Sequence, residues 1–346
     1  MSLFSYTLKL NARRVPDWVT GEIRSVEWVE SIDELDAITI SVNAPSGANR
    51  ADALALAVAG SSFELKVTTD TGTLIATGDI VESSIRSTAG GNFEVVLRGL
   101  ERLHRLRGSQ APKLWTGAPN TWFSTIATRH GLTAKAQGVD GSAPSQLQAT
   151  EDDALFLKRI AREYNYYLRV TGKELQFGRR HVSSGAAVTV PFDQVLRMNF
   201  INSLFEAVTK VSVIGSDPSM VKPEIRGVAL AAKLKKISKG VNAADQRKKA
   251  FGERHLIIPS AAASQLSLAQ ALAAAEIQKR AETFVTGSID IEGDPTAGSG
   301  QAVKLKGAPW PLNGPFLIRQ ARHSIRPGSY TTSMEFISDS LPQKPI

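Results

Sequence analysis

The chain has 346 residues, 42% of them apolar and 21% charged, a composition that predicts a globular protein of two or three domains. It contains no cysteine, which excludes disulfides, thiolate catalysis and cysteine metal sites and fits synthesis in a reducing compartment. The N-terminus alternates like a strand, and the longest apolar run, 53–59, is far shorter than the roughly 20 residues of a membrane span. We therefore expect neither export by the general route nor membrane insertion.

The first hundred residues alternate between apolar and polar side chains with a period of two. The clearest runs are 38–42, 63–67 and 93–97, each bounded by Gly, Ser, Asp or Asn. Short alternating strands at this spacing are typical of an antiparallel sandwich or barrel. We predict a first β domain over residues 1–107.

Two helices are predicted next. One covers 99–108, with leucines at helical spacing, and one lies within 118–132, with Asn120 or Thr121 as its cap. Connections rich in Gly, Pro and Ser flank the second helix. We predict a small α/β region over 108–185, inserted between two β domains.

Three carboxylates in a row, Glu151, Asp152 and Asp153, precede an apolar run and raise the question of an acid/base pair. Thr150 and Asp153 have the spacing of a capping box, and acids in the first turn complement the helix dipole. The start of a helix is the favoured interpretation, and a period-two hairpin follows, so that helix and hairpin form one unit over 150–180. The tyrosines of this unit are interpreted as packing groups rather than as a ligand cage.

Alternation returns from about Val188, first at 205–213, and further strands are predicted after an alanine-rich helix that opens at Ser267. These elements predict a second β domain over 186–346, with a basic insertion at 216–256.

This insertion carries nearly all of the net charge of +8, because residues 222–256 hold ten lysines and arginines against three acids. With Phe251 as its one aromatic residue, the segment lacks the stacking platform of single-strand binders. A solvated or partner-facing loop is the favoured interpretation, and direct nucleic-acid binding is the alternative. The candidate partner- or DNA-facing residues are Lys233, Lys235, Lys236, Lys239, Arg247, Lys248 and Lys249.

The two β domains show signs of an internal duplication. A shift of 240 residues aligns Gly60 with Gly300 and the tripeptide 84–86 with 324–326, both reading Ser-Ile-Arg, and gives six identities in 27 positions. Both segments are predicted to form a strand, a connecting segment, a second strand and a turn that contains glycine. We expect the two domains to share one fold.

No catalytic or metal-binding constellation is recognisable. The five histidines are scattered without metal-ligand spacing: His104, His130, His181, His255 and His323. A lytic enzyme would need two carboxylates in a cleft, and no spacing selects a pair among Glu22, Glu151 and Glu163. We expect no catalysis, no cofactor and no metal.

The order of motifs in the C-terminal half resembles the late control gene D family of contractile phage tails. The unit at 150–180 matches the family's helix-hairpin segment with Asp153 to Glu163 and Phe177-Gly178. The C-terminal match consists of Ala281-Glu282, Gly293-Asp294-Pro295, Gly300, Val303, Leu305, Gly314, Arg322-His323 and Gly328 to Thr332. The resemblance covers the chain from about residue 90, while the first β domain fits in length and pattern.

The resemblance implies a structural baseplate hub, related to the N-terminal hub part of type VI secretion spike proteins. Two tail-tube-like β-barrels with small α+β insertions would assemble as a homotrimer of pseudo-sixfold symmetry, which adapts a hexameric tail tube to a trimeric spike. The implied partners are the chain itself, a separate spike protein, the tube protein, other baseplate components and, as a further candidate, the tape-measure protein. DNA would only pass through the bore, and the protein would be made in the bacterial host cytoplasm and reside in the virion tail.

Two other functions stay open. The piece 118–136 is LysM-like and could bind cell-wall glycan, although bracing of neighbouring subunits is favoured. A tail-associated lysozyme is the third hypothesis, and it would lose lytic activity on changing one carboxylate, such as Glu151→Gln.

Overall fold

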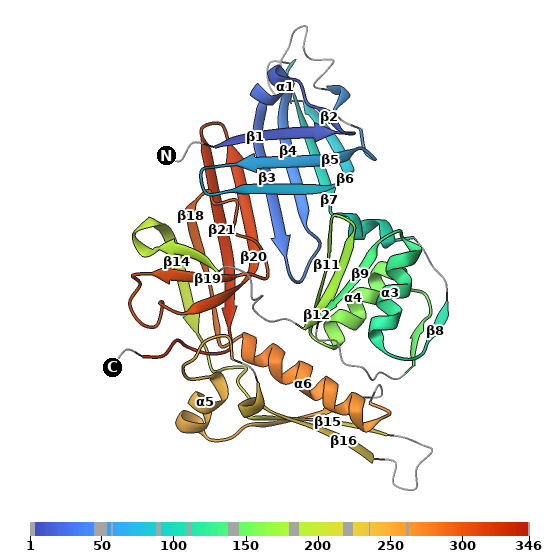
Figure 1. Cartoon of the computed structure of the whole chain (residues 1–346), viewed down its shortest axis with the longest axis vertical. Helices are drawn as coiled ribbons and strands as arrows, with labels where there is room; N and C mark the ends of the chain where they lie inside the picture. Colours follow the sequence, from blue (N-terminus) through green and yellow to red (C-terminus); the bar gives the residue numbers. More distant parts are fainter. Residues whose placement is uncertain are drawn as a thin grey trace.

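The computed structural model describes residues 4–44, 54–56, 58–87, 91–108, 112–137, 145–179, 187–216, 224–234, 236–260 and 263–344. The fold is mainly β with α/β insertions, which confirms the predicted fold class. Figure 1 shows two β regions, one blue and one red, joined along the long axis, with the insertions beside and below them. Both regions belong to one sheet of 13 strands, in the order β14-β18-β21-β20-β3-β4-β7-β6-β5-β1-β2, with β13 and β19 attached through β20.

Among its described residues, the first β half contains seven strands and the short helix α1 (Asp17–Gly21). Its alternating apolar side chains fill a core of their own, in which Ile40, Leu65 and Leu97 are fully buried. In Figure 1, β1 and β5 cross in front of β3 and β4, so the sheet curls over this core. The strands are β1 (Ser5–Leu10), β2 (Arg13–Arg14), β3 (Ile23–Ser31), β4 (Ala37–Ala44), β5 (Ser62–Thr68), β6 (Thr73–Ser87) and β7 (Phe93–Leu100).

The second β half surrounds a separate core in which Phe316 packs against Phe336, with ring centroids 4.8 Å apart. A 3-10 turn, η3 (Phe192–Gln194), connects its first two strands. Its strands are β13 (Val188–Pro191), β14 (Val195–Asn202), β18 (Val285–Glu292), β19 (Ala302–Lys306), β20 (Pro315–Arg326) and β21 (Ser329–Ser338).

The two halves repeat the same order of strands. The order β1-β5-β6-β7-β4-β3 of the first half corresponds to β13-β19-β20-β21-β18-β14 of the second, although β13 runs parallel to β19 whereas β1 runs antiparallel to β5. Equivalent strand pairs also carry equivalent bulges. They lie at Ile23/Ser25 and Val195/Arg197, and at Ile80/Glu82 and Ile318/Gln320. The expectation of a shared fold therefore has independent support in the backbone.

Backbone hydrogen bonds fix how the two halves correspond. Ile80 exchanges hydrogen bonds with Ser61 and Gly60, and Ile318 does so with Gln301 and Gly300. Both glycines have positive φ, 91° and 82°, which a side chain would strain. Gly60 thus corresponds to Gly300, as the sequence predicts.

The matching tripeptides, in contrast, are not equivalent. Ile80 corresponds to Ile318, so the excursion between the paired strands is two residues shorter in the second half. The Ser-Ile-Arg motifs are therefore two positions out of register. Ile85 is half exposed, while Ile325 is buried.

Insertion A (102–179) separates the two halves. The predicted helix at 99–108 is instead the end of β7 followed by a 3-10 turn, η2 (Arg102–Leu106). The predicted hairpin is confirmed, with Gly172 at φ 61° in its turn. The other elements are β8 (Lys113–Trp115), α3 (Pro119–Arg129), β9 (Thr133–Gln137), β10 (Gln146–Gln148), α4 (Asp153–Glu163), β11 (Tyr166–Thr171) and β12 (Glu174–Arg179).

Helix α3 is found where it is predicted, but Asn120 and Thr121 do not cap it. Pro119 occupies the first turn after Ala118, because the missing N–H of proline costs nothing at that position. Gly131 follows the helix with φ 66°. Trp122 and Phe123 are buried on the inner face of α3, and Phe123 stacks on Phe177 of the hairpin with ring centroids 3.9 Å apart.

Insertion B (203–284) lies between β14 and β18, where the first half has only the turn 32–36. The strand predicted at 205–213 begins at Lys210 instead. Helix α6 begins at Leu266 rather than Ser267 and covers the small sheet; at Gly227 an added Cβ would lie 2.0 Å from the Ala269 carbonyl carbon. The elements are β15 (Lys210–Ser216), β16 (Glu224–Leu230), η4 (Ala231–Lys233), α5 (Ala243–Phe251), β17 (His255–Pro259) and α6 (Leu266–Glu282).

One hydrophobic core is shared by the two insertions. It joins Phe156 and Leu157 of insertion A with Leu268 and Ile277 of insertion B. The domain boundaries stay a prediction, with domains over 1–107, 108–185 and 186–346. The cores add that most buried residues of 208–277 pack with the inserted α/β region, whereas Ala243 packs into the core of the second β half.

Candidate assembly surfaces

The two β halves meet where β3 runs antiparallel to β20. Residues 26–31 of β3 pair with 320–325 of β20, and the Ile32 N–H extends the ladder by donating to the Arg319 carbonyl at 3.0 Å. This part of β20 lies beyond its contact with β19, so β3 replaces β19 along the same edge. Main-chain hydrogen bonds, through one edge of each half, therefore join the halves into one sheet.

Side chains reinforce this internal junction. Trp28 is buried edge-on against Phe63 of the same half, with ring centroids 6.1 Å apart, and their core also includes Ile325 and Tyr330 of the second half. Two ion pairs connect the halves at the rim: Arg322 donates to Glu27 at 2.8 Å, and Arg319 donates to Asp33. Apolar burial supplies most of the stabilisation, because half-exposed ion pairs contribute little.

His323 occupies the buried side of the junction. Its Nε2 lies 3.0 Å from the Ala297 carbonyl, which can only accept, and its Nδ1 lies 2.9 Å from the Tyr330 hydroxyl. Burial lowers the pKa of His323, so the ring is neutral, with Nε2–H donating and Nδ1 accepting. Burial also raises the pKa of Tyr330, which keeps its hydroxyl a donor. The Arg-His pair of the family motif is thus part of the junction.

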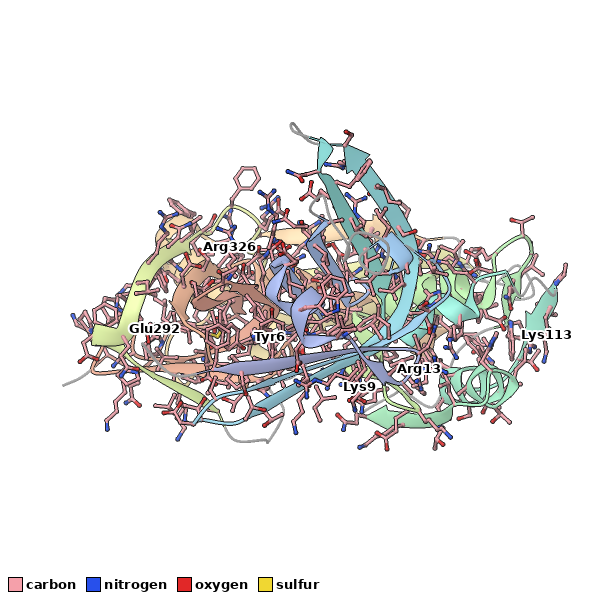
Figure 2. All side chains as sticks on the ribbon, turned by 90° about the horizontal axis from the view of Figure 1, so that it is seen from above. Tyr6, Lys9, Arg13, Lys113, Glu292 and Arg326 are labelled. Atoms are coloured by element: carbon pink, nitrogen blue, oxygen red, sulfur yellow. The ribbon has the colours of Figure 1, made fainter. Side chains whose placement is uncertain are left out.

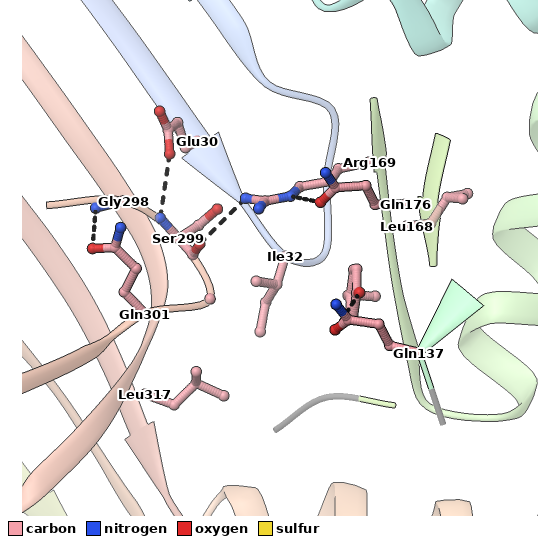
Figure 3. Close-up of a pocket in the computed structure, with 12 residues that line it drawn as sticks. Glu30, Ile32, Gln137, Leu168, Arg169, Gln176, Gly298, Ser299, Gln301 and Leu317 are labelled. Carbon is pink, nitrogen blue, oxygen red and sulfur yellow. Dashed lines mark hydrogen bonds between the residues drawn. The ribbon is translucent and has the colours of Figure 1, made fainter. Parts of the chain in front are cut away.

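A cavity of about 230 Å³ lies where both halves meet insertion A (Figure 3). Glu30 of β3 accepts from the Ser299 N–H at 3.3 Å, and Arg169 of β11 donates to the Ser299 carbonyl at 3.4 Å. Arg169 also donates to Gln176 at 3.2 Å, which holds the guanidinium toward the loop. One polar cluster thus ties β3, the loop before β19 and the hairpin of insertion A together.

Two buried carboxyl groups lie behind this cluster. Glu101 accepts from the Val170 N–H at 3.0 Å, and burial raises the pKa of Glu101 to about 7. Burial, with the charges of Glu101 and Glu30, also raises the pKa of Asp36 well above its ordinary range. Asp36 accepts from the Ser31 N–H at 2.9 Å. The contact between insertion A and the first half therefore contains two buried carboxyl groups, Glu101 and Asp36, whose protonated form is favoured.

The predicted basic segment is not a loop in the part of the chain that the structure describes. Strand β16, turn η4, helix α5 and strand β17 occupy most of 224–259, because Ile225 alternates into the core and Asn242 caps α5 by accepting from Asp245 N–H at 2.7 Å. Lys235 lies outside the described residues.

The described basic residues divide into two groups. Lys236 and Lys248 have acidic partners, Asp245 at 3.8 Å and Glu253 at 2.7 Å, and Arg247 lies over the Phe251 ring. The remaining three are exposed and form no ion pair among the residues described here: Lys233, Lys239 and Lys249. The structure therefore gathers part of the predicted set around η4 and α5, and these three keep the free charge that a partner or DNA could contact.

The three acids at 151–153 start a helix, as predicted, but with other roles. Asp152, not Thr150, caps α4 by accepting from the Leu155 N–H at 2.8 Å. Asp153 is fully buried and accepts from Arg129 at 2.9 Å, while the ring of His130 lies 2.9 Å from it. Its burial, which a capping role does not require, makes it a structural centre of insertion A.

Glu151 and Glu163 approach the same cation. Arg159 lies 2.8 Å from Glu151 and 4.0 Å from Glu163, and burial raises the pKa of Glu163. Glu22 lies between α1 and β3, in a different part of the molecule. None of the three lines the cavity described above. The structure therefore pairs two of the predicted carboxylates, but through an arginine that fixes them.

The other described histidines have single polar partners. His104 lies 2.7 Å from Asp79, and His255 lies 2.8 Å from Ser212. His181 lies outside the described residues. Among the residues with described positions, no three side chains of the metal-binding types come together, and no helix is long and apolar enough to cross a membrane.

Sequence reasoning missed the junction residues. Asp36, Glu101 and Trp28 belong to ordinary alternating strands and turns, and their partners lie far away in the chain; Glu101 meets Val170 and Arg322 meets Glu27, 295 residues apart. The sequence held one signal of the junction, the pair Arg322-His323. This pair is part of the motif that resembles the late control gene D family, but the sequence assigns it no role.

No family model and no curated protein matches the sequence. The chain is similar to the solved 43 kDa tail protein of prophage MuSo2 from Shewanella oneidensis, with 12% identity and a TM-score of 0.69 over 98% of this chain and 100% of that one. It is also similar to a tail protein from Neisseria meningitidis MC58, with 13% identity and a TM-score of 0.65 over 97% of both chains.

A third similar structure is the c3393 protein of E. coli, a component of the type VI secretion system that itself resembles the phage T4 tail proteins gp27 and gp5. It shows 14% identity and a TM-score of 0.62 over 98% of this chain and 79% of that one. Likeness at such identities establishes the fold. The chain therefore has the fold of phage tail proteins and of a type VI secretion component, which is the fold that its resemblance to the late control gene D family implies.

Proposed function

We propose that the chain is the structural baseplate hub of a contractile phage tail or a phage-like injection particle. The observation that carries the proposal is the duplication: two β halves of equal strand order are joined edge to edge within one chain. The likeness to tail proteins over nearly the whole chain supports it.

The duplication suits an adaptor between two symmetries. Three copies of a chain with two equivalent halves place six halves around one axis, and the ring keeps true threefold symmetry. Such a ring can face a hexameric tail tube on one side and a trimeric spike on the other. The proposed partners are the chain itself, the spike, the tube protein, other baseplate components and the tape-measure protein, in the tail of the virion.

The proposed role requires no reaction. Glu151 and Glu163 are held by Arg159 outside the cavity, which argues against a pair poised for glycoside hydrolysis. A lytic role makes a clear prediction, because Glu151→Gln would abolish clearing of cell walls by the purified protein. We expect no clearing by either form, and clearing by the natural protein alone would contradict the proposal.

We further propose that the exposed lysines around η4 and α5 face a partner or the DNA in passage. Lys233, Lys239 and Lys249 have no acidic partner among the described residues. Their triple change to Gln is expected to weaken salt-sensitive retention of DNA or of a baseplate partner. The matched control changes Lys66, Lys173 and Lys304 on other surfaces, which are also exposed and form no ion pair among the described residues. Equal loss in both variants would indicate a general charge effect and contradict a specific surface.

Light scattering tests the proposed function. The purified chain has a mass of 37.2 kDa, and we expect a species near three times that mass, alone or in a three-to-three complex with the spike protein of the same particle. A monomer that persists at high concentration and ignores the spike would contradict the hub and favour the glycan-binding alternative, which a cell-wall pull-down measures.

A further inference from the structure

The cavity where both β halves meet insertion A is lined by one cation and one anion that lack an ion-pair partner. Arg169 donates to the Gln176 side chain at 3.2 Å and to the Ser299 carbonyl at 3.4 Å, both uncharged acceptors. Glu30 accepts from Trp28 Nε1 at 3.0 Å and from the Ser299 N–H at 3.3 Å, both uncharged donors. Among the described residues, neither charge forms an ion pair, although both side chains are partly buried. A charge drawn out of water without a counter-charge is costly.

The backbone of Ser299 separates these two charges. Glu30 binds the N–H of this residue and Arg169 binds its carbonyl, so each side chain is anchored at a different end of the same residue (Figure 3). Lys113 and Glu292 illustrate the more usual placement of charge, at the outer rim of the molecule (Figure 2). The pair at the cavity instead presents a positive and a negative group to one space of about 230 Å³.

The polar side chains around the cavity leave donors over. The Gln301 oxygen accepts from the Gly298 N–H at 3.2 Å, and the NH₂ group of Gln301 has no acceptor among the described residues. The Gln137 oxygen accepts from the Tyr167 hydroxyl at 3.1 Å. The Ser299 hydroxyl is buried and also lacks a partner in the described part of the chain. The cavity therefore favours a ligand that brings acceptor oxygens.

The remaining wall is apolar, and it limits the size of a ligand. Ile32, Leu168 and Leu317 supply this wall and are buried. Gln137 is the exposed member of the lining, which makes the end of β9 the entrance. The volume of about 230 Å³ is smaller than the roughly 300–1,000 Å³ of sites for drug-sized molecules, and it suits a ligand of amino-acid size.

We propose that this cavity binds a small zwitterion of the α-amino-acid type. The carboxylate of the ligand pairs with Arg169, its ammonium group pairs with Glu30, and its side chain lies against the apolar wall. Such a ligand supplies the counter-charge that each of the two residues lacks, through charge-assisted hydrogen bonds. A plain carboxylate would meet the like charge of Glu30, and a plain amine that of Arg169, so the site selects against ligands with one charge.

The ligand would also stabilise the arrangement around it. The lining comes from β3, from the segment before β20 and from the hairpin of insertion A, so the cavity exists only while these parts are in contact. A solute that binds this folded arrangement alone stabilises it by mass action. The inference does not depend on the proposed hub, and its failure would leave the hub untouched.

Leucine and two analogues test the proposal on the purified full chain. Leucine carries both charges and an apolar side chain, whereas leucinamide lacks the carboxylate and 4-methylpentanoate lacks the ammonium group. Saturation-transfer NMR and thermal unfolding at constant ionic strength should show saturable binding of leucine. Each analogue should bind at least about tenfold more weakly, because it loses one charged hydrogen-bond partner. Equal binding of all three, or no saturable binding of leucine, would overturn the proposal.

Two variants that remove one charge assign the two ends of the ligand. In Glu30→Gln, which keeps an acceptor for Trp28 and Ser299, 4-methylpentanoate should bind at least as well as leucine. In Arg169→Gln, leucinamide should bind at least as well as leucine. Glu292→Gln is the matched control, since this exposed acid also forms no ion pair among the described residues and lies away from the cavity. Preferences that stay unchanged in both cavity variants would contradict the assignment.

Gly298→Ala tests the space without changing a charge. Its added Cβ would lie 3.0 Å from a Glu30 carboxylate oxygen and 3.6 Å from Gln301 Nε2, and Gly298 is not among the glycines with positive φ. The chain should therefore fold, while leucine binding weakens several-fold. Full leucine binding by this variant would place the ligand outside the cavity and overturn the proposal.

Discussion

Strands β3 and β14 occupy equivalent places in the two β halves and differ in what covers them. Strand β3 pairs with β4 and with β20 of the other half, and Trp28 is buried. Strand β14 pairs with β18, and Phe200, at the position equivalent to Trp28, is only partly buried. The core of the first half includes Ile325 and Tyr330 of the second, whereas the described core of the second half contains no residue of the first. The first half therefore depends on the junction for part of its apolar burial.

The largest difference is expected between Trp28→Ala and Phe200→Ala. Trp28 is buried against Phe63, so its truncation should lower the free energy of unfolding by about 3–5 kcal/mol. Phe200 is only partly buried, against Phe316 and Phe336, so its truncation should cost less, about 1–2 kcal/mol. Urea unfolding at a concentration that keeps the chain monomeric measures both. Equal losses would mean that β14 is covered as fully as β3.

The contact of insertion A should depend on pH through Glu101. Its pKa is about 7 in the folded chain against an ordinary 4.5, so the folded state holds the proton more tightly. This contribution is fully present below pH 4.5 and is lost as the pH rises through 7. Glu101→Gln keeps a neutral group at this position. It should make the free energy of unfolding fall less steeply with rising pH and should raise it at pH 8 by about 2 kcal/mol.

Asp36→Asn is the companion variant, because burial raises the pKa of Asp36 in the same direction. It should also reduce the loss of stability that sets in as the pH rises above about 4, the ordinary pKa of an aspartate. An unchanged pH profile in both variants would show that these acids are ionised in the folded chain and would remove them from the account of this contact.

The smallest effect is expected at the rim of the internal junction. Arg322 and Glu27 are both about half-exposed, so their coupling in a double-mutant cycle with alanine should be below about 1 kcal/mol. A coupling of several kcal/mol would mean that charge, rather than the burial of Trp28, holds the two halves together.

Sequence reasoning succeeded where a signal is local. Helix α4 and the 166–178 hairpin follow from short-range periodicity and from the turn at Gly172. The duplication was visible because Gly60 and Gly300 occupy the same left-handed position in both halves. Local rules misplaced the caps, since Thr150 has the right spacing for a capping box but Asp152 makes the hydrogen bond.

What the sequence could not predict depends on contacts between distant segments. Nothing near Glu101 indicates that Val170 will meet it, and nothing near Arg322 indicates Glu27. The basic segment was misread as a loop because its charges hide the period-two pattern of β16 and the capped helix α5. The cavity has no local signal either, because Glu30, Arg169 and Ser299 come from three distant segments.

Electron microscopy of the purified chain tests the central claim most directly. Three copies should appear as closed rings with six similar β lobes around a bore. Isolated two-lobed particles at every concentration, or open filaments, would contradict a trimeric hub.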